Sequence, residues 1–221
     1  MIEITISSEL FSKWPDLILS CLECDVTVKE KDEILWKKIE EVCLKIEASL
    51  KIEEISQIPA IHATRKVYRT FGKDPARYRP SAEALMRRVV RGDGLYQVNN
   101  VVDIVNLVSL ETGFSIGGYD SSKIQMPIIL SIGQNNDLYE GVGRGKLNIE
   151  GLPVLRDQFG AFGSPTSDSI RTSVDNDTQK FLMVIFGFGD HACIYATIQF
   201  AEILLKEYAS STKIINTIIK N

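Results

Sequence analysis

The chain has 221 residues, of which 44% are hydrophobic and 24% charged, as in ordinary soluble globular proteins. No apolar run reaches the roughly 18 residues that a membrane-spanning helix needs. The alternating start Met1-Ile-Glu-Ile-Thr-Ile-Ser is typical of a strand, not of a signal peptide. These features exclude a membrane protein and predict a cytoplasmic protein folded as one domain over residues 1–221.

The net charge of −4 hides an uneven distribution. Residues 1–56 hold 13 acidic and 7 basic side chains, whereas residues 65–91 hold 9 basic and 2 acidic ones. A basic segment in an acidic chain is a candidate surface for a polyanion. The alternative is that its arginines bridge to the acidic N-terminal part. Both interpretations stay open, and the candidate nucleic-acid-binding residues are Arg65, Arg69, Arg79, Arg87, Arg88 and Arg91.

The first half of the chain predicts strands and then helices. Alternation predicts strands at residues 2–7 and 16–28, and Asp32 can cap an amphipathic helix that runs to about Ser49. Pro59 opens a second helix that ends near Thr70. Ser81 is the expected cap of a third helix over residues 82–91.

A fourth helix is predicted over residues 101–112, capped by Asn99 or Asn100 and stopped by Gly113. It is mostly apolar, yet Asn99, Asp103 and Asn106 form one polar stripe along it. Buried polar groups need hydrogen-bond partners, so the stripe is either a structural network or a set of ligand contacts.

The second half predicts mainly strands, at residues 126–132, 137–141, 153–159 and 180–186, followed by a helix over 192–208. The glycine-rich run 140–145 lacks the GK[ST] signature of a phosphate-binding loop and indicates a kink or hairpin. This order predicts an α+β (mixed α/β) fold with a central sheet flanked by helices. Its parts are expected to be N-terminal strands and a helix in 1–58, a middle region 60–190, and a C-terminal helix in 191–221.

Metal, redox and histidine-based chemistry find little support. Cys21 and Cys24 form a lone CxxC without a second ligand pair, and buried free thiols are the simpler interpretation. His62 and His191 are the only histidines, and neither is near a serine cluster. No metal site and no cofactor are therefore expected, and a Ser-His-Asp triad is not indicated.

Residues 163–172, Gly-Ser-Pro-Thr-Ser-Asp-Ser-Ile-Arg-Thr, are the candidate site. They place hydroxyls, one carboxylate and one guanidinium within ten residues, a composition suited to a pocket for a polar small molecule. A turn whose hydroxyls bond to its own backbone is the alternative. The candidate catalytic residues are Thr166 and Asp168, and the candidate substrate-binding residues are Ser164, Ser167, Ser169, Arg171, Asn99, Asp103 and Asn106.

Several segments resemble the B3/B4 domain of the bacterial phenylalanyl-tRNA synthetase β chain. They are Arg79-Pro-Ser-Ala-Glu-Ala-Leu-Met-Arg-Arg88, the run from Asn99 to Gly113, Gly118-Tyr-Asp120 with Lys123-Ile124, and Thr166-Ser-Asp-Ser-Ile-Arg171. The resemblance covers roughly residues 60–190. It implies an α/β domain that hydrolyses tyrosine mischarged on the phenylalanine tRNA, and it implies that the Thr166–Arg171 segment lines the editing pocket. No aminoacylation domain or ATP-binding feature accompanies it, so ligase activity is not expected.

The chain departs from that family at three positions. Gly117 stands where the synthetase has a histidine, Asp157 is the nearest carboxylate to its glutamate, and Asp168 replaces the small alanine that admits the substrate ring. By the resemblance, Thr166 contacts a substrate or orients a water. Arg171 would bind a carboxylate, a phosphate or the terminal ribose.

Three functional hypotheses remain. The first is a trans-acting aminoacyl-tRNA editing protein that hydrolyses a mischarged ester, with the six arginines on the tRNA backbone and no DNA partner. The second is a non-catalytic module for an amino acid or another amine, with Asp168 as the counter-charge. The third is an interaction protein in which residues 65–91 meet an acidic partner.

Overall fold

The computed structural model describes residues 2–189 and 191–220, without the side chains of His191 and Ala192. The α+β class is confirmed. The helices are α1 (Ser8–Lys13), α2 (Glu33–Ser49), α3 (Pro59–Thr70), α4 (Ser81–Val90), α5 (Asn100–Thr112) and α6 (His191–Tyr208), with 3-10 turns at Ile55–Gln57, Ser121–Lys123 and Ile170–Thr172. The strands are β1 (Ile4–Ile6), β2 (Ile18–Asp25), β3 (Ser115–Asp120), β4 (Ile128–Ile132), β5 (Glu140–Gly141), β6 (Gly145–Lys146), β7 (Pro153–Asp157), β8 (Gly160–Gly163), β9 (Lys180–Gly187) and β10 (Ile214–Lys220).

Two four-stranded sheets replace the single central sheet that the sequence predicts. The outer sheet has the order β1-β4-β7-β8, and the inner sheet has the order β10-β2-β9-β3. The inner sheet is antiparallel throughout, and the outer sheet has one parallel pair, β1 with β4. The glycine-rich run forms the hairpin β5–β6, as expected, and Gly143 and Gly145 in it have positive φ values.

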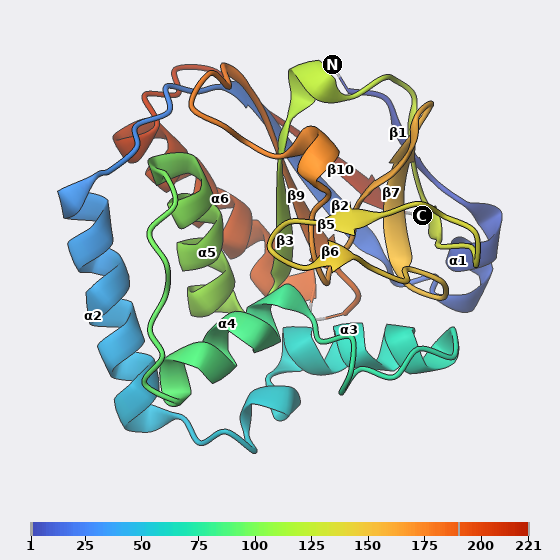
Figure 1. Ribbon diagram of the computed structural model, residues 1–221, viewed down its shortest axis with the longest axis horizontal. Helices are drawn as coiled ribbons and strands as arrows, with labels where there is room; N and C mark the ends of the chain where they lie inside the picture. Colours follow the sequence, from blue (N-terminus) through green and yellow to red (C-terminus); the bar gives the residue numbers. More distant parts are fainter. Residues whose placement is uncertain (1, 190, 221) are drawn as a thin grey trace.

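The molecule is layered, with helices α2, α4, α5 and α6 on one face of the inner sheet and the outer sheet on its other face (Figure 1). Strand β9 contributes side chains to the packing on both faces of the inner sheet. Phe181, Met183 and Ile185 point to the helical side, and Leu182 and Val184 point to the outer sheet. A strand buried on both faces is apolar without alternation, which is the pattern of this segment.

The two cysteines of the CxxC segment lie on opposite faces of β2. Cys21 packs between the sheets, and Cys24 packs under the helices. Both are free and buried, and burial raises the pKa of Cys21 to about 12 and the pKa of Cys24 to about 11. Thiols of this kind are unreactive at neutral pH. Among the described residues, no three His, Cys, Asp or Glu side chains gather at a metal-binding spacing.

Two of the predicted helix caps are confirmed and one is wrong. The Asp32 carboxylate accepts the Leu35 N–H at 3.1 Å, and the Asn99 side chain accepts the Val102 N–H at 2.9 Å. Ser81 instead lies inside the first turn of α4 after Pro80, and its buried hydroxyl has no partner among the described residues. A tertiary contact accounts for this position, because the Ser81 N–H donates to the Pro165 carbonyl at 2.7 Å.

Four elements were not predicted: α1, β3, β8 and β10. The segment 191–221, expected to be helical, is α6 followed by β10, the edge strand of the inner sheet. The strand expected at residues 137–141 shrinks to two residues, and Leu138 in it is 94% exposed. No helix in the described part of the chain is long and apolar enough to cross a membrane.

Candidate functional site

The serine-rich loop, residues 164–169, joins β8 to the turn Ile170–Thr172 and is clamped from the side of the β5–β6 hairpin. Ser169 bridges to Gly141, and the Val142 N–H donates to the Asp168 carbonyl at 2.9 Å. The Tyr139 hydroxyl donates to the Ser167 carbonyl at 2.5 Å. These contacts fix the backbone of the loop on this side.

From the opposite side, α3 holds Thr166. The Thr166 hydroxyl lies 2.8 Å from the Tyr68 hydroxyl, and both side chains are buried. Burial raises the pKa of Tyr68, so the phenol stays protonated. The hydroxyl that the sequence nominates for catalysis is therefore already engaged in a buried hydrogen bond.

The serines of the loop bond mainly to its own backbone. Ser164 Oγ accepts the N–H of Thr166 at 3.3 Å and the N–H of Ser167 at 3.2 Å, and it donates to the Ser167 carbonyl at 3.0 Å. Ser167 Oγ donates to the Asp168 carbonyl at 3.3 Å, and Ser169 Oγ accepts the Arg171 N–H at 3.3 Å. This is the arrangement of a self-bonded Ser/Thr turn.

Asp168 is the titratable group of the loop. It is half-buried, and its Oδ2 accepts the Gly118 N–H from β3 at 3.1 Å. Burial raises the pKa of Asp168 to about 7, although the Tyr119 hydroxyl and the Gly118 N–H act against this rise. The carboxyl group can therefore exchange a proton at neutral pH.

Tyr119 lies beside Asp168, in the space between the two sheets. Its hydroxyl oxygen would be 1.9 Å from a Cβ on Gly117 of β3 and 2.1 Å from a Cβ on Gly163 of β8. Its ring packs edge-on against Phe162, with 5.1 Å between centroids. Any side chain at Gly117, a histidine included, would require Tyr119 to move.

Arg171 is paired with Asp157. Two bonds join the guanidinium to the carboxylate, at 3.0 Å and 2.8 Å. Asp157 also accepts the N–H groups of Gln125 and Phe159, each at 2.9 Å. The pair anchors the turn after the serine-rich loop to the end of β7.

A cavity of about 640 Å³ opens beside the hairpin. Ser169 and Arg171 lie on its wall, while Thr166 and Asp168 do not. Its other lining residues are Asp137, Leu138, Tyr139, Glu140, Lys146, Leu147, Asn148, Phe159 and Ala161.

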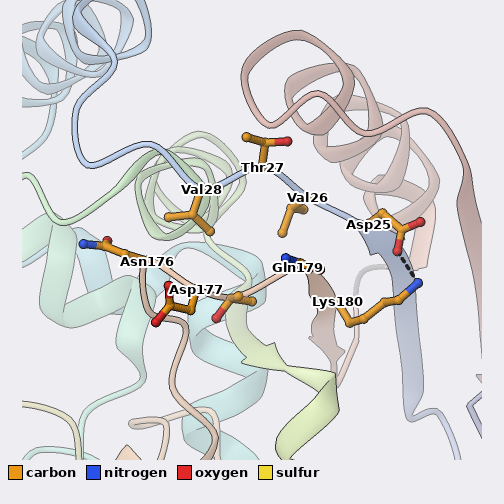
Figure 2. A pocket seen from close by; sticks show the side chains of 9 residues that line it. Asp25, Val26, Thr27, Val28, Asn176, Asp177, Gln179 and Lys180 are labelled. Atoms are coloured by element: carbon orange, nitrogen blue, oxygen red, sulfur yellow. Dashed lines mark hydrogen bonds and ion pairs between the residues drawn. The ribbon is translucent and has the colours of Figure 1, made fainter.

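A second cavity, of about 540 Å³, lies where β2 ends and β9 begins (Figure 2). It is lined by residues 25–28 and 176–180, and an ion pair between Asp25 and Lys180 crosses one side of it. None of the sequence-nominated site residues lines it.

The polar stripe of α5 belongs largely to a structural network. Asn99 caps the helix, and Asp103 accepts the Val98 N–H at 3.1 Å, with its pKa raised by burial to about 6. Asn106 is half-buried on the same helix. The amide of Asn100 makes the long-range contacts, with the Lys29 N–H and the carbonyls of Thr27 and Tyr208. The only sequence signal for this role of Asn100 was the pair of neighbouring asparagines at the helix start.

The basic segment divides into buried pairs and exposed charges. Arg65 and Arg87 both bind Glu83, which is fully buried, at 2.7 Å and 2.9 Å. Their partner therefore lies inside the segment rather than in the acidic N-terminal part.

Arg88 donates to the carbonyls of Asp93 and Gly94 and lies 4.4 Å from the centroid of the Tyr96 ring. Arg69 and Arg91 are exposed and Arg79 is half-buried. Within residues 2–189 and 191–220, no ion pair is formed by these three. The nucleic-acid hypothesis therefore depends on Arg69, Arg91 and Arg79.

Fold and loop together define a two-sheet α+β domain whose polar loop is anchored between a helix and a hairpin. Residues 63–202 match the family model of the B3/4 domain, and the chain belongs to this family. Its fold is similar to that of an N-terminal fragment of the phenylalanyl-tRNA synthetase β-subunit from Pyrococcus horikoshii, with 14% identity and a TM-score of 0.50. That match covers 100% of this chain and 55% of the synthetase fragment, so the chain spans about half the length of that structure. No curated protein matches the chain.

Proposed function

We propose that this B3/4 domain protein associates with tRNA and hydrolyses the ester of a mischarged aminoacyl-tRNA in trans. Membership of the B3/4 family and the likeness to a synthetase β-subunit fragment support the tRNA part of the proposal. The exposed arginines Arg69 and Arg91 provide charge for the phosphate backbone. The catalytic part rests on one observation, a half-buried Asp168 whose pKa is raised to about 7.

In this mechanism the Asp168 carboxylate acts as a general base. It takes a proton from water, and the hydroxide adds to the acyl carbonyl carbon. The bond between that carbon and the ribose oxygen then breaks, and the proton is delivered to the ribose oxygen. The products are a free amino acid and an uncharged tRNA. A base with a pKa near the working pH is well matched to this step.

Thr166 enters the proposal as the residue that holds the loop, through its bond to Tyr68, rather than as a nucleophile. Ser164 supports it by fixing the backbone of residues 166 and 167. Arg171 positions the far end of the loop through Asp157.

The test is a deacylation assay on a panel of charged tRNAs, with release of the labelled amino acid as the readout. Asp168→Asn should lower kcat/KM at pH 7 by a factor on the order of 10²–10⁴, the usual contribution of a general base. Thr166→Ser, which keeps the hydroxyl, is the matched control and should stay within a few-fold of wild type. A folded wild-type protein that releases no amino acid from any charged tRNA would disprove the hydrolase proposal.

A non-catalytic amino-acid or amine module is the second candidate. The observation that favours it is that the hydroxyls of Thr166 and Ser164 are both engaged in hydrogen bonds within the protein. Calorimetric binding of free amino acids, abolished by Asp168→Asn but without ester turnover, would support this function over the first.

A further inference from the structure

Two glycines face each other across the gap between the sheets, and the Tyr119 hydroxyl lies between them. Gly117 is on β3 and Gly163 is on β8. Neither glycine has a positive φ, so the backbone conformation does not require glycine at either position. A Cβ on either residue would come within 2.1 Å of the Tyr119 oxygen. Glycine is needed there because the phenol occupies the space.

The Tyr119 phenol differs from the other tyrosines around the loop. The hydroxyls of Tyr68 and Tyr139 bond to Thr166 and to the Ser167 carbonyl. Tyr119 is fully buried, and no hydrogen bond with good geometry reaches its hydroxyl from the described residues. Buried hydroxyls are nearly always paired, and the carboxyl group of Asp168 is the polar side chain that acts most strongly on this one.

The space that the Tyr119 phenol fills adjoins Asp168 of the candidate site. Asp168 is close enough to Tyr119 to raise the pKa of the phenol, after the larger effect of burial. The Gly118 N–H, next to both glycine and tyrosine in β3, donates to Asp168. Asp168 is half-buried as a residue, and its carboxyl group lies beside the phenol.

We propose that Tyr119 fills the side-chain pocket of this site from within and acts as its specificity-determining residue. With Tyr119 in place, an acyl group approaching Asp168 has no room for a large side chain, so the accepted substrate carries a small one, of glycine or alanine size. The substrate part rests on the proposed hydrolase function. The occupancy of the pocket by Tyr119 does not.

The occupancy is tested with p-cresol, which has the shape of a tyrosine side chain. An engineered apolar cavity of about 150 Å³ stays empty and binds benzene, so the space left by Tyr119→Ala should bind p-cresol. Titration is followed by NMR and by the shift in Tm, because a ligand that binds only the folded state raises Tm. Tyr119→Ala should respond. Wild type, Tyr119→Phe, which keeps the ring, and Tyr208→Ala, which opens a space under the helices, should not.

The specificity is tested with tRNAs charged with alanine or with phenylalanine and tyrosine. In Tyr119→Ala the ratio of kcat/KM on the aromatic esters to kcat/KM on the alanyl ester should rise at least about tenfold over wild type, equivalent to ~1.4 kcal/mol. A wild-type ratio already as high as that of the variant would overturn the proposal.

The two parts fail separately. If neither wild type nor Tyr119→Ala hydrolyses any of the esters, the proposed function is wrong. The p-cresol titration alone then decides whether Tyr119 occupies the pocket. A folded Tyr119→Ala that does not bind p-cresol overturns the occupancy. If this variant is unfolded, refolding in p-cresol supports the proposal, and no recovery in p-cresol overturns it.

Discussion

The hydroxyl groups of Thr166 and Tyr68 lie 2.8 Å apart in a buried position and connect the serine-rich loop to α3. Removal of one partner leaves the other buried and unpaired, which costs about 1–3 kcal/mol. Thr166→Val and Tyr68→Phe should each destabilise the protein by about that much, as measured by urea unfolding. Because they break the same bond, the double variant should lose clearly less than the sum. Additive losses would contradict the coupling.

Asp168 should give opposite pH dependences to stability and activity. Its pKa is about 7 in the folded protein, against an ordinary value near 3.9 in the unfolded chain. Between these values the folded state holds a proton that the unfolded chain has lost, so stability falls as pH rises from about 4 to 7 and then levels.

Asp168→Asn should remove this fall and make the protein roughly 1–3 kcal/mol more stable than wild type at pH 8. Denaturant unfolding at pH 5, 6, 7 and 8 measures it. Asp103 acts in the same direction, so the difference between the two proteins is the informative quantity.

The activity, if Asp168 is the base, should rise about tenfold per pH unit below pH 7 and reach a plateau above it. The rise requires the ionised carboxylate, the form that burial disfavours. Single-turnover deacylation between pH 5 and 8 records the profile. A rate that is flat across this range would exclude Asp168 as the general base.

The glycine at position 163 should tolerate a methyl group only when Tyr119 is shortened. A Cβ there would lie 2.1 Å from the Tyr119 oxygen and 2.6 Å from its ring, so Gly163→Ala should destabilise wild type by about 1–3 kcal/mol. In a Tyr119→Ala background the same change should be nearly neutral or stabilising. Equal effects in both backgrounds would show that the phenol can move aside freely. The control is Gly160→Ala, whose Cβ meets nothing but whose positive φ strains any side chain.

The basic segment should separate into binding and structural arginines. Arg69→Ala and Arg91→Ala remove exposed charges and should weaken tRNA binding for all sequences alike, lowering the salt slope of log K by about one each. Arg65→Ala instead removes a partner of the buried Glu83 and should destabilise the fold by roughly 3 kcal/mol. Binding at several salt concentrations and urea unfolding distinguish the two groups. A tRNA affinity that does not change with salt would contradict the electrostatic interface.

Local patterns predicted helices α2 to α6 well because most of their ends carry local signals, whereas the short helix α1 was missed. Asp32, Asn99, Pro59 and Gly113 mark helix ends through bonds or φ values that involve only neighbouring residues. Ser81 shows the limit of such rules, because a contact with Pro165, far along the chain, changed its place in the helix. The two edge strands of the inner sheet, β3 and β10, were likewise not predicted. β3 contains Gly117 and Gly118, which are poor strand residues, and they are explained only by side chains that pack on them from other elements.

The candidate site was found by composition, but its chemistry was not. Hydroxyls in the serine-rich loop looked available, yet hydrogen bonds to Tyr68 and to the loop backbone occupy those of Thr166 and Ser164. No sequence rule pairs Arg171 with Asp157 or predicts that burial shifts the pKa of Asp168. The sequence marked Tyr119 only as part of a family motif. That its side chain fills the space beside Gly163 could not be predicted, because this glycine is more than 40 residues away in the chain.

The pairing of β2 with β10 sets when this protein can fold. Residues 18–25 find their edge partner in residues 214–220, so the inner sheet is completed only after almost 200 further residues have been synthesised. Until then the backbone N–H and C=O groups along one edge of β2 are unpaired, and such an edge can pair wrongly with another nascent chain. Long-range pairing of this kind also slows folding. Ribosome-bound chains that end before residue 214 should therefore depend on chaperones, and protection of β2 from protease should appear only once β10 has emerged.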